Sequence, residues 1–209
     1  LVSSGESANR VEAALIAAVQ RGVRVRCLFD SFGSRRLRSA QRQHWLAAGI
    51  ELRFYNPLRW QRGLENFYRD HRKLLIVDQQ VAYIGGTGLT DQFWQPDSEY
   101  SQWHEVMVRV VGPVVNDWQN LFDSQWRSCI QRFFWQQNNS PKKVPQYNMP
   151  ALPFANVGKA RVAYAASTQH RDIQKALLRA LKGAHQTVWL ATPYFLPTWA
   201  VRRALRKAA

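Results

Sequence analysis

The stretch 70–78 carries the side chains of this sequence that are best suited to chemistry on a phosphate. His71, Lys73 and Asp78 interrupt an otherwise apolar run with the composition of a β-strand. Alternate side chains of a strand share a face, so His71 and Lys73 point the same way and Asp78 lies on the other face. An imidazole can attack phosphorus or carry a proton, while a neighbouring ammonium holds the charged oxygens. The pattern predicts a phosphate-processing site at a strand end.

The spacing His-x-Lys-x-x-x-x-Asp resembles the signature of the phospholipase D superfamily, and a glycine pair follows where that family usually has Gly-Gly or Gly-Ser. The local context, over residues 66–73 and 81–86, is most similar to the bacterial cardiolipin synthase branch. The resemblance implies phosphodiester exchange through a phosphohistidine, with lysines rather than a metal neutralising the phosphoryl oxygens. A histidine and a lysine on an ordinary surface strand are the alternative interpretation.

The resemblance also implies a role for individual residues. His71 is the expected catalytic imidazole, either as the nucleophile or as the general acid, and Lys73 is expected to bind the phosphate oxygens. Asp78 completes the motif, and its strand face suggests a structural role. In similar proteins a carboxylate about thirty residues downstream fixes the tautomer of the imidazole. Glu105 best matches that position, and Glu99 is the second candidate.

The glycine pair is a candidate phosphate-binding element. Gly85 and Gly86 let the backbone approach a ligand closely, and Thr87 adds a hydroxyl. The family pattern usually has an asparagine where this sequence has Gly88, so that amide contact is either replaced by the backbone or by Thr87, or is missing. The sequence contains no cluster of Asp, Glu and His at metal-ligand spacing, and we expect neither a metal nor another cofactor.

The elements around the motif alternate between helix and strand, which is typical of an α/β fold. We expect helices over 8–20 and 37–48, strands over 23–30, 50–55, 72–78, 81–84 and 104–111, an irregular loop over 87–103, and a long helix with an apolar stripe from 114 to 133. With the resemblance, these elements predict a phospholipase D-like fold, a mixed β-sheet flanked by helices.

The stretch 56–70, which leads into His71, is rich in arginine and aromatic residues. Such a loop can grip a lipid head group or lie on a membrane surface. It can also stack nucleic-acid bases, or be an exposed loop with packed aromatics. The sequence leaves these three interpretations open.

A proline-rich linker divides the chain. We expect a first phospholipase D-like half over residues 1–135, the linker over 136–158, and the incomplete start of a second half over 159–209. The last part has a strand pattern over 160–165, a helix over 172–182, a strand over 187–191 and the start of another helix. Because the repeat is cut at both ends, we expect a fragment, completed by a second motif roughly 50 residues past its end or by a homodimer partner.

Charge and composition limit the partners. The chain has 29 basic and 14 acidic residues, a net charge of +15, and 46% apolar residues, which excludes a disordered chain. The charge predicts an anionic partner, such as lipid head groups, nucleic acid or another polyphosphate. No run approaches the length of a transmembrane helix. Cys27 and Cys129 are expected to be packing residues.

The favoured function is phosphatidyl transfer of the cardiolipin synthase type. The substrate would be an anionic, phosphatidylglycerol-like phospholipid, and the protein would lie peripherally on the cytosolic face of the bacterial inner (cytoplasmic) membrane. A phospholipase D-type hydrolase would use the same residues with water as the acceptor. A nuclease or phosphodiesterase of the same superfamily, or a basic binding module, are further alternatives, but the second-half pattern argues against a nucleic-acid partner.

Overall fold

The computed structural model describes residues 2, 5–91, 105–129, 160, 162–163, 165–166, 170–192 and 195–208. The chain divides into two compact units, Leu1–Lys159 and Ala160–Ala209, and each is described by itself. Across these described ranges, none of the helices combines the length and the apolar character needed to span a bilayer.

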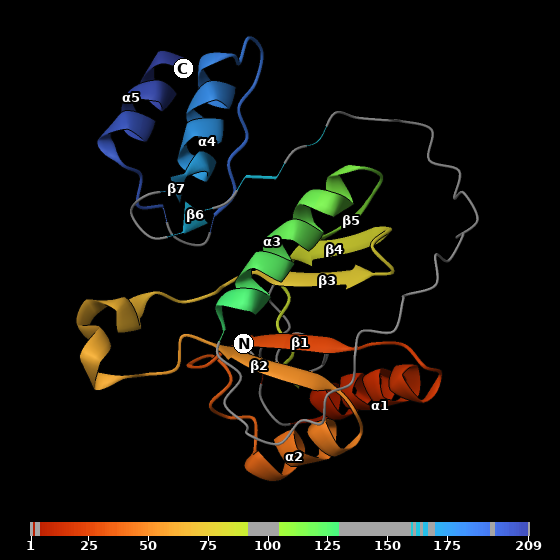
Figure 1. Cartoon of the computed structure of the whole chain (residues 1–209). Helices are drawn as coiled ribbons and strands as arrows, with labels where there is room; N and C mark the ends of the chain where they lie inside the picture. The colour runs from red at the N-terminus through yellow and green to blue at the C-terminus, as the bar shows by residue number, and fades with distance from the viewer. Residues whose placement is uncertain are drawn as a thin grey trace. The chain divides into compact units, whose positions relative to one another are not determined.

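The first part of unit 1 is a parallel strand pair with two helices (Figure 1). Its elements are α1 (Glu6–Gln20), β1 (Arg26–Asp30), α2 (Ser39–Ala47) and β2 (Glu51–Tyr55). Each helix is followed by a glycine with a left-handed backbone, Gly22 at φ 85° and Gly49 at φ 90°. The strands pair in register, so that Asp30 and Tyr55 lie side by side at their carboxyl ends.

Aromatic packing holds α2 against this strand pair. Trp45 of α2 and Ile50 are fully buried. The Trp45 ring lies 5.7 Å from the Phe29 ring of β1, and Phe29 lies 6.5 Å from Phe54 of β2, measured between centroids. Cys27 shares the Phe29 face of β1, and burial raises the pKa of its thiol to about 12.

The second part of unit 1 is a three-stranded antiparallel sheet in the order β3–β4–β5. Its elements are β3 (Lys73–Val77), β4 (Val81–Gly85), β5 (Met107–Val111) and the covering helix α3 (Val114–Ser128). The β3–β4 turn has left-handed Asp78 (φ 51°) and Gln79 (φ 58°), and the Gln80 amide donates to the Val77 carbonyl over 3.0 Å. Two successive left-handed residues match the twist of a hairpin.

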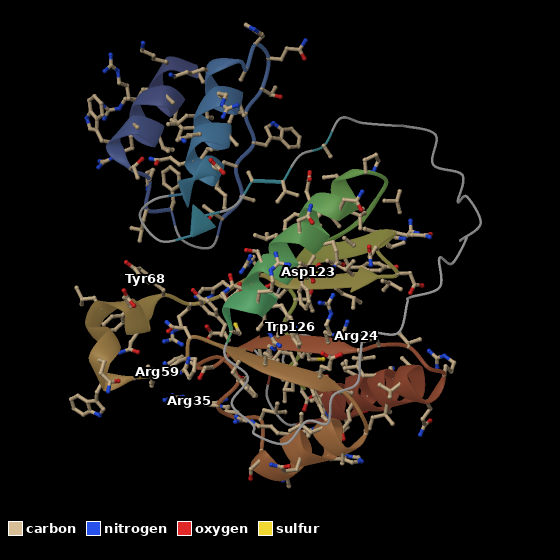
Figure 2. The ribbon with its side chains drawn as sticks, viewed as in Figure 1. Arg24, Arg35, Arg59, Tyr68, Asp123 and Trp126 are labelled. Carbon is tan, nitrogen blue, oxygen red and sulfur yellow. The ribbon has the colours of Figure 1, made fainter. Side chains whose placement is uncertain are left out.

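Helix α3 joins the two sheets of unit 1 (Figure 2). It packs against β3, β4 and β5. Near the end of α3, buried Trp126 packs against two guanidinium groups. The guanidinium carbon of Arg53 (β2) lies 4.4 Å from the Trp126 ring centroid, and that of Arg26 (β1) lies 5.6 Å from it. Arg26 also pairs with Asp123 of α3 over 2.7 Å. Arg26 of β1 and Arg53 of β2 therefore both face the aromatic ring of Trp126 on α3.

Unit 2 contains a short antiparallel pair and two helices. Its elements are β6 (Ala165–Ala166), β7 (His170–Arg171), α4 (Asp172–Lys182) and α5 (Trp199–Ala208). The helices pack through Leu181 of α4 and Val201 and Ala204 of α5, all buried. This apolar contact is the core of unit 2.

The α/β class and most of the expected elements of unit 1 are confirmed. The parallel and antiparallel pairings lie in two separate sheets. The stretch 56–70 is not an open loop throughout, because Trp60–Phe67 forms a 3-10 helix, η1, with a kink at Gly63. The helix expected to reach 133 ends at Ser128 in the described residues, and Cys129 has an extended backbone there. Cys27 and Cys129 are free thiols.

Two strand predictions in unit 2 are wrong. Residues 187–191 are irregular, and the strand expected over 160–165 is limited, in the described residues, to Ala165–Ala166. A β-strand exists only by pairing, and no described strand pairs with 187–191. Most of the 87–103 loop, residues 130–135 and the linker 136–158 lie outside the described residues. The division at 135 and 158 stays a prediction.

Candidate active site

One end of the three-stranded sheet collects most of the predicted site residues. Lys73 pairs with Gly85 across β3 and β4, and Gly85 pairs with Met107 of β5. His71 and Glu105 lie two residues before β3 and β5 begin, and Thr87 lies two residues after β4 ends, so all three are at this same end of the sheet. The sheet thus brings an imidazole, an ammonium, a hydroxyl and a carboxylate from three separate segments to one edge.

The Lys73 side chain folds back toward the residue two positions before it. Its Nζ donates to the His71 carbonyl oxygen over 2.8 Å. His71 is exposed and Lys73 is half-buried. The contact fixes the ammonium beside residue 71 and leaves the imidazole accessible from solvent.

The two glycines make room for different neighbours. A Cβ on Gly85 would collide with the Val106 carbonyl and with Met107, which means that β5 approaches β4 closely at this point. A Cβ on Gly86 would collide with the carboxylate of Glu105. Glu105 therefore lies over Gly86, and no described hydrogen bond joins it to the His71 ring. Its role in fixing the imidazole tautomer stays a prediction.

The segment after the glycine pair is tied to the start of α1. Asp91 accepts hydrogen bonds from the backbone amides of Ser7 (2.7 Å) and Glu6 (3.2 Å). These bonds, with that from the Ser7 backbone foremost, lower the pKa of the Asp91 carboxyl. Leu89 forms a bridge with Val2 in the same region. Thr87, half-buried, is thus held between β4 and an anchored turn.

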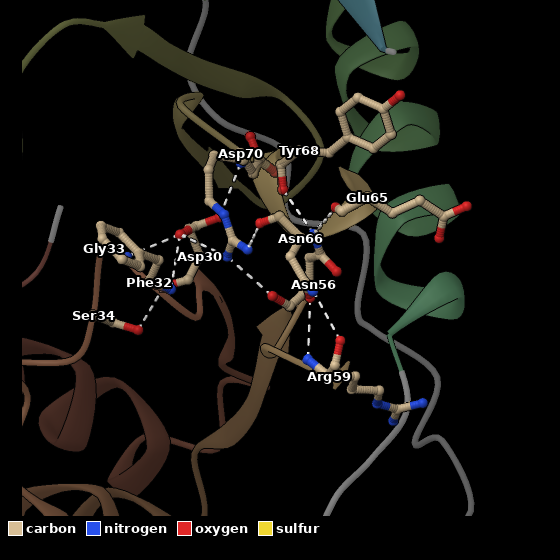
Figure 3. Close-up of polar contacts among 11 residues, drawn as sticks. Asp30, Phe32, Gly33, Ser34, Asn56, Arg59, Glu65, Asn66, Tyr68 and Asp70 are labelled. Atoms are coloured by element: carbon tan, nitrogen blue, oxygen red, sulfur yellow. Dashed lines mark hydrogen bonds and ion pairs between the residues drawn. The ribbon is translucent and has the colours of Figure 1, made fainter. Parts of the chain in front are cut away.

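Asp30, at the carboxyl end of β1, holds the backbone that leads into His71 (Figure 3). Its Oδ1 accepts from the amides of Phe32 (2.9 Å) and Gly33 (2.8 Å), and its Oδ2 accepts from the Asp70 amide (3.0 Å). The Arg69 guanidinium lies 3.7 Å from Oδ1, and the two side chains are 13% and 9% exposed. A mostly buried carboxylate thus joins the β1 loop to residues 69–70.

A second group of hydrogen bonds fixes the chain just before residues 69–70 (Figure 3). Buried Asn56 donates from Nδ2 to the carbonyls of Glu65 (2.7 Å) and Tyr68 (2.8 Å). Arg69 donates to the Asn56 carbonyl (3.0 Å) and to the Asn66 carbonyl. The chain therefore leaves the 3-10 segment η1 at a defined position.

Arg72, the residue after His71, is bonded to Asp70 and to helix α3. Arg72 forms a two-pronged pair with Asp70, with distances of 2.8 and 2.7 Å, and its Nη2 donates to Gln125 of α3 over 3.1 Å. His71 is thus flanked by Asp70, bound to β1, and by Arg72, bound to α3. These bonds position the backbone of His71 and leave its side chain accessible.

Asp78 is the motif residue that the structure sets apart. It is exposed, in the hairpin turn at the far end of β3 from Lys73. Asp30 and Arg69 are the positioning residues that the sequence analysis missed. Asp30 could have been identified from the sequence, because it is the last residue of a strand in a parallel pair. Ligand sites of α/β folds are commonly found at the carboxyl ends of such strands. Glu99 lies outside the described residues. Within those that are described, no three His, Cys, Asp or Glu side chains form a metal-binding group.

Comparison with known proteins places this site in a family. Residues 4–126 match the family model "Cardiolipin synthase, PLD-like domain", where PLD is phospholipase D. The chain is 31% identical to cardiolipin synthase 1 of Bacillus anthracis over 100% of its length, and 29% identical to the major cardiolipin synthase ClsA of Bacillus subtilis over 97%. It spans 41% of the length of each of these relatives. The chain belongs to the family of cardiolipin synthase phospholipase D-like domains.

Proposed function

We propose that this chain supplies half of the active site of a phosphatidyltransferase of the cardiolipin synthase type. The supporting observation is the gathering of His71, Lys73, the glycine pair and Glu105 at one sheet edge, in a chain of this family. The same arrangement would serve a hydrolase, with water as the acceptor. The relatives are named synthases, which favours an alcohol acceptor.

The reaction proceeds in two displacements at phosphorus. One imidazole nitrogen attacks the phosphorus of a phosphatidylglycerol-like donor, a P–N bond forms, and the P–O bond to the head-group alcohol breaks. A second imidazolium gives its proton to the leaving alkoxide. The hydroxyl of a second phospholipid then gives a proton to that imidazole and attacks phosphorus, so that the P–N bond breaks. His71 is one of these two imidazoles, and Lys73 holds the phosphoryl oxygens.

The remaining assignments follow from this chemistry. Glu105 orients an imidazole, Gly85, Gly86 and Thr87 line the phosphate site, and Asp78 closes the hairpin. The second imidazole comes from a second motif in the rest of the protein or from a homodimer partner. The protein acts peripherally on the cytosolic face of the bacterial inner membrane, where its anionic phospholipid substrate is found.

Product analysis of the full-length protein tests the proposal. Incubated with phosphatidylglycerol vesicles, it should form cardiolipin and free glycerol in equal amounts. Phosphatidic acid in place of cardiolipin would identify a hydrolase. Cleavage of DNA, with no lipid product, would overturn the proposal in favour of a nuclease, whose binding should fall steeply with salt.

A further inference from the structure

The segment Leu58–Tyr68 exposes large apolar side chains next to the site. In η1, Trp60 is 100% exposed, Leu64 81% and Phe67 78%. Leu58 and Tyr68, at the ends of the segment, are also exposed. Figure 1 draws the segment in orange, standing away from both sheets of unit 1. Single exposed apolar residues are ordinary, but a contiguous group of this kind indicates an interaction surface.

Hydrogen bonds at both ends of the segment hold its apolar side chains in exposed positions. Asn56 binds the carbonyls of Glu65 and Tyr68 at the exit of the segment. At its entrance, Asn66 accepts from the Arg59 amide over 3.0 Å and donates to the Arg59 carbonyl over 2.8 Å. These polar side chains take up the inward side of the turn. The apolar side chains are left on the outside because the inner positions are occupied by hydrogen-bonded amides.

The chemistry of the segment fits the surface of an anionic lipid bilayer. Tryptophan, phenylalanine and leucine partition into the boundary between head groups and acyl chains, while arginines pair with lipid phosphates. The segment contains two arginines and one glutamate, within a chain of net charge +15. Figure 3 shows the Arg59 guanidinium pointing away from the hydrogen-bonded network. One short segment thus combines exposed apolar side chains with more arginines than glutamates.

The segment is also directly linked to His71. Arg69 bonds to Asn56 and Asn66 on the segment and pairs with Asp30, which holds the Asp70 amide beside His71. Only the residues from 69 to 70 separate the segment from the imidazole in sequence. An element that rests on the bilayer here would present the head-group layer to the imidazole without removing the lipid from the membrane.

We propose that Leu58–Tyr68 is the membrane contact of this site, which inserts Trp60, Leu64 and Phe67 into an anionic lipid surface. The inference rests on the proposed function, because it names the element through which that site reaches its lipid. A competing occupant is the rest of the full-length protein, which could cover the same side chains.

The test uses the full-length protein and three variants. The triple substitution Trp60→Ser, Leu64→Ser, Phe67→Ser removes the apolar anchors, Gln61→Ala is the matched exposed polar control on the same segment, and Trp60→Phe is the conservative change. Binding is measured by co-sedimentation with vesicles of phosphatidylglycerol and phosphatidylcholine. Turnover is measured on the same vesicles and on short-chain phosphatidylglycerol below its critical micelle concentration.

The triple variant should bind vesicles at least about tenfold more weakly, since each buried apolar side chain alone contributes on that order. Turnover on vesicles should fall in parallel, while turnover on monomeric lipid is unchanged. Gln61→Ala and Trp60→Phe should behave like the wild type. These results together would support the membrane contact.

Unchanged vesicle binding by the triple variant would overturn the inference. A lower melting temperature with equal losses on vesicles and monomers would also overturn it, because it would place the segment against the rest of the protein. If the wild-type protein yields no lipid product on either substrate, the proposed function fails. The difference in vesicle binding still decides the role of the segment in that case.

Discussion

Among single residues, Asp30 has the largest role in placing His71, although it lies 40 positions before Asp70, whose amide it binds. Replacing it by Ala leaves three backbone amides without their acceptor and Arg69 without its carboxylate. We expect Asp30→Ala to lower the free energy of unfolding by about 3–5 kcal/mol, as for other mostly buried pairs. Urea denaturation measures this change.

The matched control for Asp30 is an exposed ion pair. Arg24 binds Glu51 through two contacts of 2.5 and 3.1 Å, but its side chain is 46% exposed. Arg24→Ala should therefore lower the free energy of unfolding by only about 0–1 kcal/mol. Equal losses in the two variants would contradict the positioning role of Asp30.

The two neighbouring glycines should respond differently to a methyl group. In Gly85→Ala the new Cβ meets the backbone of Val106 and Met107, which cannot move without displacing β5. We expect a loss of about 3 kcal/mol in the free energy of unfolding. In Gly86→Ala the Cβ meets the end of the Glu105 side chain, which can rotate away.

Gly86→Ala should consequently cost less than about 1 kcal/mol of stability, yet turnover should fall because the Glu105 carboxylate is displaced. Thermal unfolding and initial rates on phosphatidylglycerol vesicles separate the two effects. A folded Gly86→Ala variant with wild-type turnover would show that Glu105 has no part in the reaction.

At the level of elements, the N-terminus of α1 is capped by a residue from a distant loop. Asp91→Ala removes the acceptor of the Ser7 and Glu6 amides and should lower the free energy of unfolding by about 1 kcal/mol. The Ser7 backbone amide holds the pKa of Asp91 below 3.8, its ordinary value. The stabilisation is complete above this ordinary value and is lost as the pH falls through the lower, folded-state pKa.

Comparison of three proteins over pH isolates this effect. The stability difference between the wild type and Asp91→Ala should be constant from neutral pH down to about pH 5 and shrink below it. Asp91→Asn keeps an acceptor oxygen but no titrating group, so it should retain most of the cap at neutral pH. A difference that grows on acidification would contradict the assigned cap.

The elements that were predicted correctly from the sequence are those marked by residues within or next to the element itself. The helices α1 and α2 are each followed by a glycine, and the β3–β4 hairpin turn follows an apolar run. The failures have a tertiary cause. Residues 187–191 have the composition of a strand and remain irregular, because strand formation depends on a partner. The exposed helix η1 was not predicted, because its turns depend on side-chain bonds from Asn56 and Asn66.

The same division applies to the site. His71, Lys73 and the glycine pair are close in sequence and were found from their spacing. The network around them was not, because Asp30, Arg69 and Asp91 form hydrogen bonds over separations as large as 85 residues. Glu105 lies at the same end of the sheet as Lys73 because it precedes β5, which pairs antiparallel with β4, whereas the β3–β4 hairpin turn places Asp78 at the other end.

At the level of the whole molecule, unit 1 carries the site and two sheets joined by α3. The chain spans about two fifths of the curated relatives reported above. A reaction that needs two imidazoles is therefore proposed for the full-length protein and not for unit 1 alone. The net charge of +15 and the exposed segment Leu58–Tyr68 both agree with the proposed function at an anionic lipid surface.

The most direct test of the central claim is the turnover of phosphatidylglycerol by His71→Ala in the full-length protein. The matched control is His44→Gln, which replaces another exposed histidine, one that binds Glu12 in α1 over 2.6 Å. Removal of a nucleophile or general acid should lower kcat by at least about a thousandfold, with folding and vesicle binding unchanged. Wild-type turnover in a folded His71→Ala variant would contradict the account.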